Sequence, residues 1–271
     1  MTFRRTLTAA TVASLALAGA AAAVGPDLPA LQRATLSAGT TRYVVRSTPA
    51  GTAVRKVVDG RIAARTVLHG GWGLQLATYR GDLAGLSGNG RTLVLSDNVE
   101  ANGRLRASSK FAVLDTGSLA VTRKITLRGD YGVDALSPRG DVLYLIHHVS
   151  NADVTRYQVQ AYDLAAGRLI PGVIADKRQS GWVMAGNPIS RAASTDGRWV
   201  YTLYQQSNNY PFVHALDAAH RTAICVGLPV DWTKPWLSTA HLILADGKLK
   251  VMSGTRTRLV VDTSTFAVST P

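Results

Sequence analysis

Three residues with side chains suited to ligand binding or catalysis occupy the same position in successive copies of a repeated pattern. Asp134, Arg191 and His241 each lie six residues before a glycine that belongs to a tight turn. A carboxylate and a guanidinium can hold a polar or anionic ligand, and an imidazole can exchange a proton near neutral pH. If the repeats stand side by side, the three side chains form a ligand site or a catalytic constellation. The structural alternative is a ring of salt bridges and hydrogen bonds around a water-filled channel.

Several aromatic residues lie in or near the loops that lead into the same segments: Trp72, Tyr79, Tyr131, Trp182 and Trp236. Aromatic side chains offer a ligand a large apolar surface together with a polar edge. We therefore predict a ligand site with Asp134, Arg191 and His241 as candidate catalytic residues. The complete predicted set is Tyr131, Asp134, Arg191, Trp236 and His241.

The sequence predicts neither a metal site nor a cofactor. The single cysteine, Cys225, excludes an internal disulfide and any Cys-based zinc site, and Glu100 is the only glutamate. His147 and His148 are adjacent on an expected strand, so their imidazoles point to opposite faces. Cys225 lies between apolar residues and has no basic neighbour, which predicts a buried, inert thiol.

Four segments share one pattern of short apolar strands around a Gly-containing turn. A third strand in each unit ends on an aspartate, which we expect to cap the turn into a fourth strand. A weaker copy occurs early, at Asp59. The turn glycines are Gly90, Gly140, Gly197 and Gly247, and the strand-ending aspartates are Asp115, Asp163, Asp217 and Asp262.

The repeated unit therefore consists of four antiparallel strands in about 48 residues, and about five units fill the chain. Beyond residue 24 there is no sustained helical period in the apolar residues. An all-β chain with four strands per repeat predicts a β-propeller of four-stranded antiparallel blades. Five blades fit the spacing, and six remain open if residues 34–76 and 182–189 hide further strands.

Several stretches resemble the WD40-like and YVTN-type propeller repeats of secreted prokaryotic proteins. They are FAVLDTGSLAVTRKITL (111–127), LSPRGDVLYLI (136–146) and ASTDGRWVYTLYQ (193–205). The resemblance covers most of residues 80–270 and is weaker over 35–79. It implies that the first strand of each blade lines a central channel, and that loops leading into those strands carry the ligand site. The WD and GH dipeptides of true WD40 blades are absent.

The N-terminus has the features of a secretory signal peptide over residues 1–23. Arg4 and Arg5 precede an uncharged stretch that ends in small residues, with cleavage expected after one of residues 20–23. The Sec route is predicted; the Arg pair leaves twin-arginine export as an alternative, and an uncleaved anchor is another. Residues 24–40 are expected to be a linker or a ring-closing strand, and residues 41–271 the propeller.

The positive charge indicates the class of partner. Processing removes two arginines and lowers the formal net charge from +13 to +11. Arginines are spread along the whole chain without runs, which argues against a nucleic-acid partner and favours anionic cell-envelope polymers or another protein as the partner. The alternative is that the positive charge serves general solubility.

We expect a monomeric binding or scaffold module, secreted, periplasmic or in the cell envelope, without a membrane segment after processing. The alternative is a propeller enzyme of lyase or lactonase type acting on a small carbohydrate or lactone.

Overall fold

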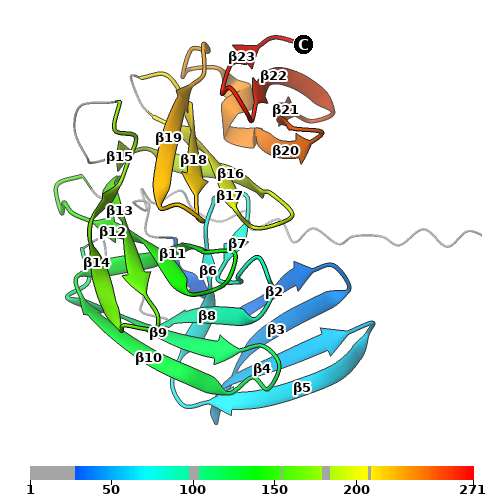
Figure 1. Cartoon of the computed structure of the whole chain (residues 1–271), viewed down its shortest axis with the longest axis vertical. Helices are drawn as coiled ribbons and strands as arrows, with labels where there is room; N and C mark the ends of the chain where they lie inside the picture. The colour runs from blue at the N-terminus through cyan, green and yellow to red at the C-terminus, as the bar shows by residue number, and fades with distance from the viewer. Residues whose placement is uncertain (1–27, 98–103, 154, 179–183, 207–208) are drawn as a thin grey trace, which may run out of the picture.

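The computed structural model describes residues 28–97, 104–153, 155–178, 184–206 and 209–271 (Figure 1). The predicted signal peptide lies outside these residues. The described chain is built from strands, with one short 3-10 helix, η1 (Pro235–Thr239). Within these ranges, no helix has the length and apolar character required to cross a membrane.

Five antiparallel sheets follow one another along the chain, and we call them blades 1 to 5 (Figure 1). In four of them, the strands pair in chain order. Blade 1 consists of β2 (Arg33–Ala38), β3 (Thr41–Thr48), β4 (Gly51–Val58) and β5 (Arg61–Leu68). Blade 3 consists of β11 (Asp130–Leu136), β12 (Val142–His148), β13 (Arg156–Asp163) and β14 (Arg168–Ile174), with β15 (Met184–Ala185) also paired to β13.

Blades 4 and 5 repeat the same plan. Blade 4 consists of β16 (Asn187–Ala193), β17 (Trp199–Gln205), β18 (Phe212–Asp217) and β19 (Thr222–Gly227). Blade 5 consists of β20 (His241–Ala245), β21 (Lys248–Ser253), β22 (Arg256–Asp262) and β23 (Val268–Ser269). The prediction of an all-β propeller with about five four-stranded antiparallel blades is confirmed.

Blade 2 departs from the plan because its first strand is split. It comprises β6 (Trp72–Leu76), β7 (Leu83–Ala84), β8 (Thr92–Asp97), β9 (Ser108–Asp115) and β10 (Val121–Arg128). Both β6 and the residues after β7 pair with β8, and a short N-terminal strand, β1 (Ala30–Leu31), adds to the other edge of β6. The loop between β6 and β7 is therefore free to leave the sheet.

Apolar residues alternate along the strands and form a separate core between each pair of neighbouring blades. Leu74 joins blades 1 and 2, Leu145 joins blades 2 and 3, Tyr144 joins blades 3 and 4, and Leu203 joins blades 4 and 5. Among the described residues, no such core and no hydrogen bond joins blade 5 to blade 1. The two blades stand at opposite ends of the series (Figure 1).

The N-terminal boundary differs from the prediction. Residues 33–38 form β2, the first strand of blade 1, so the first blade starts before residue 41. Among the described residues, β1 pairs with β6 and β2 pairs with β3, and neither pairs with blade 5. A ring-closing role for residues 24–40 therefore does not match the strand pairing of the described residues in this range.

The recurring aspartates have the turn-capping role that the sequence predicts. The Asp163 carboxylate accepts hydrogen bonds from the backbone N–H groups of Ala165 and Ala166, both at 2.8 Å. Asp115, Asp217 and Asp262 accept equivalent bonds from the turns that follow them. These bonds satisfy backbone donors that the sheet leaves unpaired.

Candidate functional site

Asp134 of β11 and Arg191 of β16 form a buried pair between blades 3 and 4. The Arg191 guanidinium binds both the carboxylate and the backbone carbonyl of Asp134, and its Nε donates to Thr202 Oγ1 at 3.1 Å. The side chains are only 9% and 5% exposed. Because each charge is satisfied by the other, this pair resembles a structural link more than a site that waits for a ligand.

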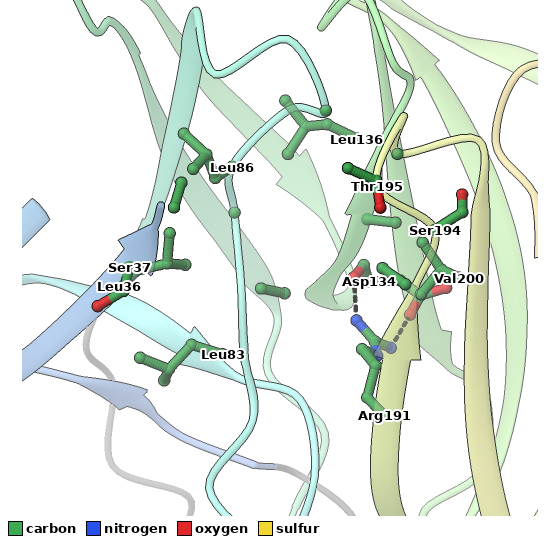
Figure 2. Close-up of a pocket in the computed structure, with 17 residues that line it drawn as sticks. Leu36, Ser37, Leu83, Leu86, Asp134, Leu136, Arg191, Ser194, Thr195 and Val200 are labelled. Carbon is green, nitrogen blue, oxygen red and sulfur yellow. Dashed lines mark hydrogen bonds and ion pairs between the residues drawn. The ribbon is translucent and has the colours of Figure 1, made fainter. Parts of the chain in front are cut away.

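A cavity of about 440 Å³ lies against this pair (Figure 2). Asp134 and Arg191 line one side, and Leu36 and Leu83 line the other. The rest of the lining comes from the turn ends of the first strands, including Leu86, Leu136, Ser194 and Thr195. The cavity thus lies towards the turn end of the first strands, away from the loops where we predicted the ligand site.

At the turn end, the hairpins of blades 2 and 4 meet through two glycines. A Cβ on Gly197 would lie 2.5 Å from the Cα of Gly88. Gly197 also has a φ of +71°, which side-chain-bearing residues rarely adopt. Any larger residue at either position would separate the two turns.

At the opposite end, the loop between β6 and β7 crosses to the far blades. Tyr79 N–H donates to the Pro188 carbonyl at 3.0 Å, and Arg80 donates to the Thr239 carbonyl at 2.9 Å. The Asp82 carboxylate accepts the backbone N–H of Arg191 at 2.8 Å. This loop occupies the position where the sequence predicted an open channel mouth.

The other predicted site residues are dispersed. Tyr131 is buried between blades 2 and 3, where its ring stacks on His147 at 4.2 Å and its hydroxyl contacts Gln160 at 3.2 Å. Trp236 lies in η1 with the Arg258 guanidinium 5.5 Å from its ring centre. His241 begins β20 opposite Met252 and is not among the residues that line the cavity. Of the predicted set, the structure therefore brings together only Asp134 and Arg191. His241, Tyr131 and Trp236 are not part of this pair.

A polar row extends from the buried pair across all four strands of blade 4. Strand register aligns Arg191 with Thr202, Thr202 with His214, and His214 with Cys225. His214 Nδ1 lies 3.6 Å from Cys225 Sγ, and the Cys225 backbone N–H donates to Asp176 at 2.9 Å. Adjacent residues of one row share one sheet face.

Burial determines the protonation states of this row. The His214 side chain is 2% exposed, and burial lowers its pKa from 6.5. Burial also raises the pKa of the Cys225 thiol to about 12, so the thiol stays protonated at neutral pH. The sequence predicted a buried, inert thiol; Cys225 is only partly buried, but its raised pKa disfavours the reactive thiolate. Its contact with a histidine could not be predicted from the sequence because it depends on strand register.

The outer face of blade 1 carries a group of arginines that the sequence analysis did not single out. Three cross-strand rows run over β2 to β5, and each contains at least one exposed arginine. The first row contains Arg33 and Arg46, the second Arg55 and Arg65, and the third Arg42. We call these five residues the arginine face.

The arginine face has almost no acidic counterpart. Asp59 is the only acid between residues 28 and 81. Among the described residues, none of the five arginines forms a salt bridge. The basic residues are thus not simply dispersed, as the linear sequence suggests, because the sheet brings arginines that follow one another at intervals of 4 to 10 residues onto one surface. The available signal was the excess of arginines over acids between residues 28 and 81.

The arginine face explains why blade 1 packs against another blade with only one face of its sheet among the described residues. Its inner face, with Tyr43, Val45 and Val54, packs against blade 2. Its outer face presents charged side chains, together with Ile62 and Val67 at 56% and 54% exposure. Burying unpaired guanidinium groups against blade 5 would cost several kcal/mol.

Comparisons with known proteins identify similar folds only. No family model matches the chain, and no curated protein matches its sequence. The structure of TolB from Acinetobacter baumannii is similar over 84% of this chain and 50% of that one, at 12% identity and a TM-score of 0.43. The β-propeller domain of Cps50 (Swd1) from Myceliophteria thermophila is similar over 84% of this chain and 66% of that one, at 13% identity and a TM-score of 0.42. The chain thus spans half the length of the first and about two thirds of the second, and the assignment of a β-propeller rests on the strand topology described above.

Proposed function

We propose that this protein is an exported, cell-envelope binding module that holds a linear anionic polymer on the arginine face of blade 1. The observation that carries the proposal is the set of five exposed arginines on one sheet face without an ion-pair partner among the described residues. Such a surface attracts a ligand with repeated negative charges. The expected signal peptide supports an extracytoplasmic setting for that ligand.

The dimensions of a sheet suit an extended ligand. Neighbouring strands lie about 4.8 Å apart, and alternate residues of one strand about 7 Å apart. The three rows therefore spread positive charge over roughly 13–14 Å along the strands. Guanidinium groups bind carboxylate and phosphate oxygens through paired N–H donors. Both acidic polysaccharides and polyphosphates offer that chemistry.

The same feature carries a stability cost, which supports a functional role. Arg33 lies directly opposite Arg46, and Arg55 directly opposite Arg65. Like charges at directly opposed positions destabilise a sheet. A bound polyanion relieves this repulsion, so the face is more stable with a ligand than without one.

The alternative of a lyase or lactonase has less support. It required Asp134, Arg191 and His241 at one pocket, and only the first two meet. These two side chains neutralise one another in a buried position. We therefore place the ligand on the outer face of blade 1 and not at the channel.

The test uses mature protein, starting at residue 24, with polygalacturonate and with polyphosphate as probes. The key variant is Arg46→Gln/Arg55→Gln/Arg65→Gln, and the matched control is Arg168→Gln/Arg221→Gln/Arg256→Gln, which removes three exposed arginines elsewhere. Affinity for at least one polymer should fall tenfold or more in the key variant and less than twofold in the control. Wild-type affinity should also weaken steeply between 50 and 200 mM salt. Equal losses in both variants, or salt-independent binding, would overturn the proposal, and the two probes distinguish carboxylate from phosphate ligands.

A further inference from the structure

A second pocket lies on blade 4, far from the arginines in sequence. It has a volume of about 440 Å³ and is lined by Asn209, Tyr210, Asp231 and Trp232. Two of these residues follow β17, and two follow β19. Both connections leave the same end of the blade, because Phe212 of β18 pairs with Tyr204 of β17 and with Gly227 of β19.

Two hydrogen bonds, one between backbone groups and one from a side chain, hold the two loops together. The Leu228 N–H donates to the Pro211 carbonyl at 2.8 Å, and Gln205 Nε2 donates to the Trp232 carbonyl at 3.1 Å. The Asp231 carboxylate accepts the Thr233 N–H and hydroxyl at 2.8 and 2.7 Å through one oxygen. These bonds leave the other Asp231 oxygen available, and they lower the pKa of the carboxyl group, so it is ionised at neutral pH.

The aromatic rings are the unusual part of this pocket. Tyr210 is 64% exposed, the largest exposed fraction among the large hydrophobic residues of the described chain, and Trp232 is half-buried beside it. Exposed aromatic rings that flank a pocket commonly mark binding sites. Among the described residues of the two loops, the hydrogen bonds of Asn209 and Asp231 go to backbone or hydroxyl groups and do not involve the rings.

We propose that this pocket binds a neutral sugar ring of an oligosaccharide. A pyranose has an apolar face of C–H groups that packs on aromatic rings and an edge of hydroxyls that both donate and accept hydrogen bonds. The pocket matches both features. Tyr210 and Trp232 provide apolar faces, the Asn209 amide, Trp232 indole and Tyr210 hydroxyl provide donors, and Asp231 provides an acceptor.

The donors make a sugar a better fit than an organic cation. A quaternary ammonium ion would also pack on two aromatic rings near a carboxylate, but it accepts no hydrogen bonds. The mature chain, at a formal net charge of +11, also repels cations. The site is independent of the arginine face, since a neutral ligand gains nothing from those charges.

The test is titration calorimetry of the mature protein with three neutral probes, cellotetraose, chitotetraose and maltotetraose, and with choline. At least one sugar should bind with an affinity that changes less than twofold between 50 and 300 mM NaCl. Tyr210→Ala and Trp232→Ala should each weaken that binding tenfold or more, and Tyr210→Phe should weaken it less than Tyr210→Ala does.

Tyr79→Ala is the matched control, because Tyr79 is another exposed tyrosine, at 45%. It should leave sugar affinity within twofold of wild type. Binding of choline alone, binding of no probe, or equal losses in Tyr79→Ala and Tyr210→Ala would overturn the inference. Arg46→Gln/Arg55→Gln/Arg65→Gln should keep full sugar affinity, so a failure of the polyanion proposal is distinguishable from a failure here.

Discussion

Arg33 of β2 lies directly opposite Arg46 of β3, with both side chains exposed on the outer face of blade 1. Opposed like charges reduce sheet stability unless a counterion or ligand lies between them. The pair therefore connects the stability of the first blade with its proposed binding function.

Replacing Arg46 by glutamate should stabilise the protein and weaken polymer binding together. The variant converts a repulsive cross-strand pair with Arg33 into an attractive one, worth roughly 0.2–1 kcal/mol in the free energy of unfolding. Urea denaturation measures the gain, and polygalacturonate or polyphosphate binding measures the loss. A stability gain with unchanged binding would separate the pair from function, and a stability loss would contradict the repulsion itself.

The buried pair of Asp134 and Arg191 should be energetically coupled. Asp134→Asn or Arg191→Gln leaves one buried charge without its partner, so each should cost about 3–5 kcal/mol of unfolding free energy. The double variant Asp134→Leu/Arg191→Met should cost clearly less than the sum of the two single losses. Urea denaturation of all three variants tests this, and strictly additive losses would show that the two residues act independently.

His214 should make stability depend on pH in the mildly acidic range. Burial holds its folded-state pKa below 6.5, so the unfolded chain takes up the proton first. Its contribution is complete above pH 6.5 and is lost as the pH falls from 6.5 towards the folded pKa, at up to about 1.4 kcal/mol per pH unit. Asp134, Arg191, Asp176 and Cys225 surround it.

His214→Gln should flatten the stability curve between pH 7 and 5, whereas His69→Gln, at an exposed position, should not. His147, whose pKa is also lowered by burial, contributes a residual slope in both variants. Thermal unfolding at half-unit pH steps measures the difference. Parallel curves for His214→Gln and wild type would contradict the assignment.

Cys225 should resist alkylation in the folded protein. Its pKa of about 12 leaves very little thiolate at pH 8, and the thiolate is the reactive form. Iodoacetamide labelling followed by mass spectrometry should be at least a hundredfold slower in buffer than in 8 M urea. Similar rates in the two conditions would mean that the thiol is open to solvent.

The exported protein should lack its first 20 to 23 residues. Expression of the full chain in a bacterial host, followed by intact-mass analysis of the periplasmic or secreted fraction, tests the signal peptide. Retention of Met1 in that fraction would indicate an uncleaved anchor instead. Accumulation of all the protein in the cytoplasm would contradict export.

The blade plan could be predicted from sequence because its determinants are local. Turn glycines such as Gly140 and strand-ending aspartates such as Asp163 recur once per repeat and act on neighbouring backbone groups. The first strand of blade 2 could not be predicted, since the loop from residue 77 to 82 is held by partners more than 100 residues away, including Pro188 and Arg191.

The sequence by itself determined the all-β class, the four-strand repeat and the turn-capping aspartates, because each depends on contacts within a few residues. It left five or six blades open, and the tertiary structure has five sheets. The tertiary structure decided which of the candidate functional residues contact one another. It joined Asp134 to Arg191 across two blades, left His241 out of the lining of the cavity beside them, and gathered five arginines on one face. Those outcomes depend on strand register and on how blades pack, and a one-residue change in register would turn each arginine to the opposite face.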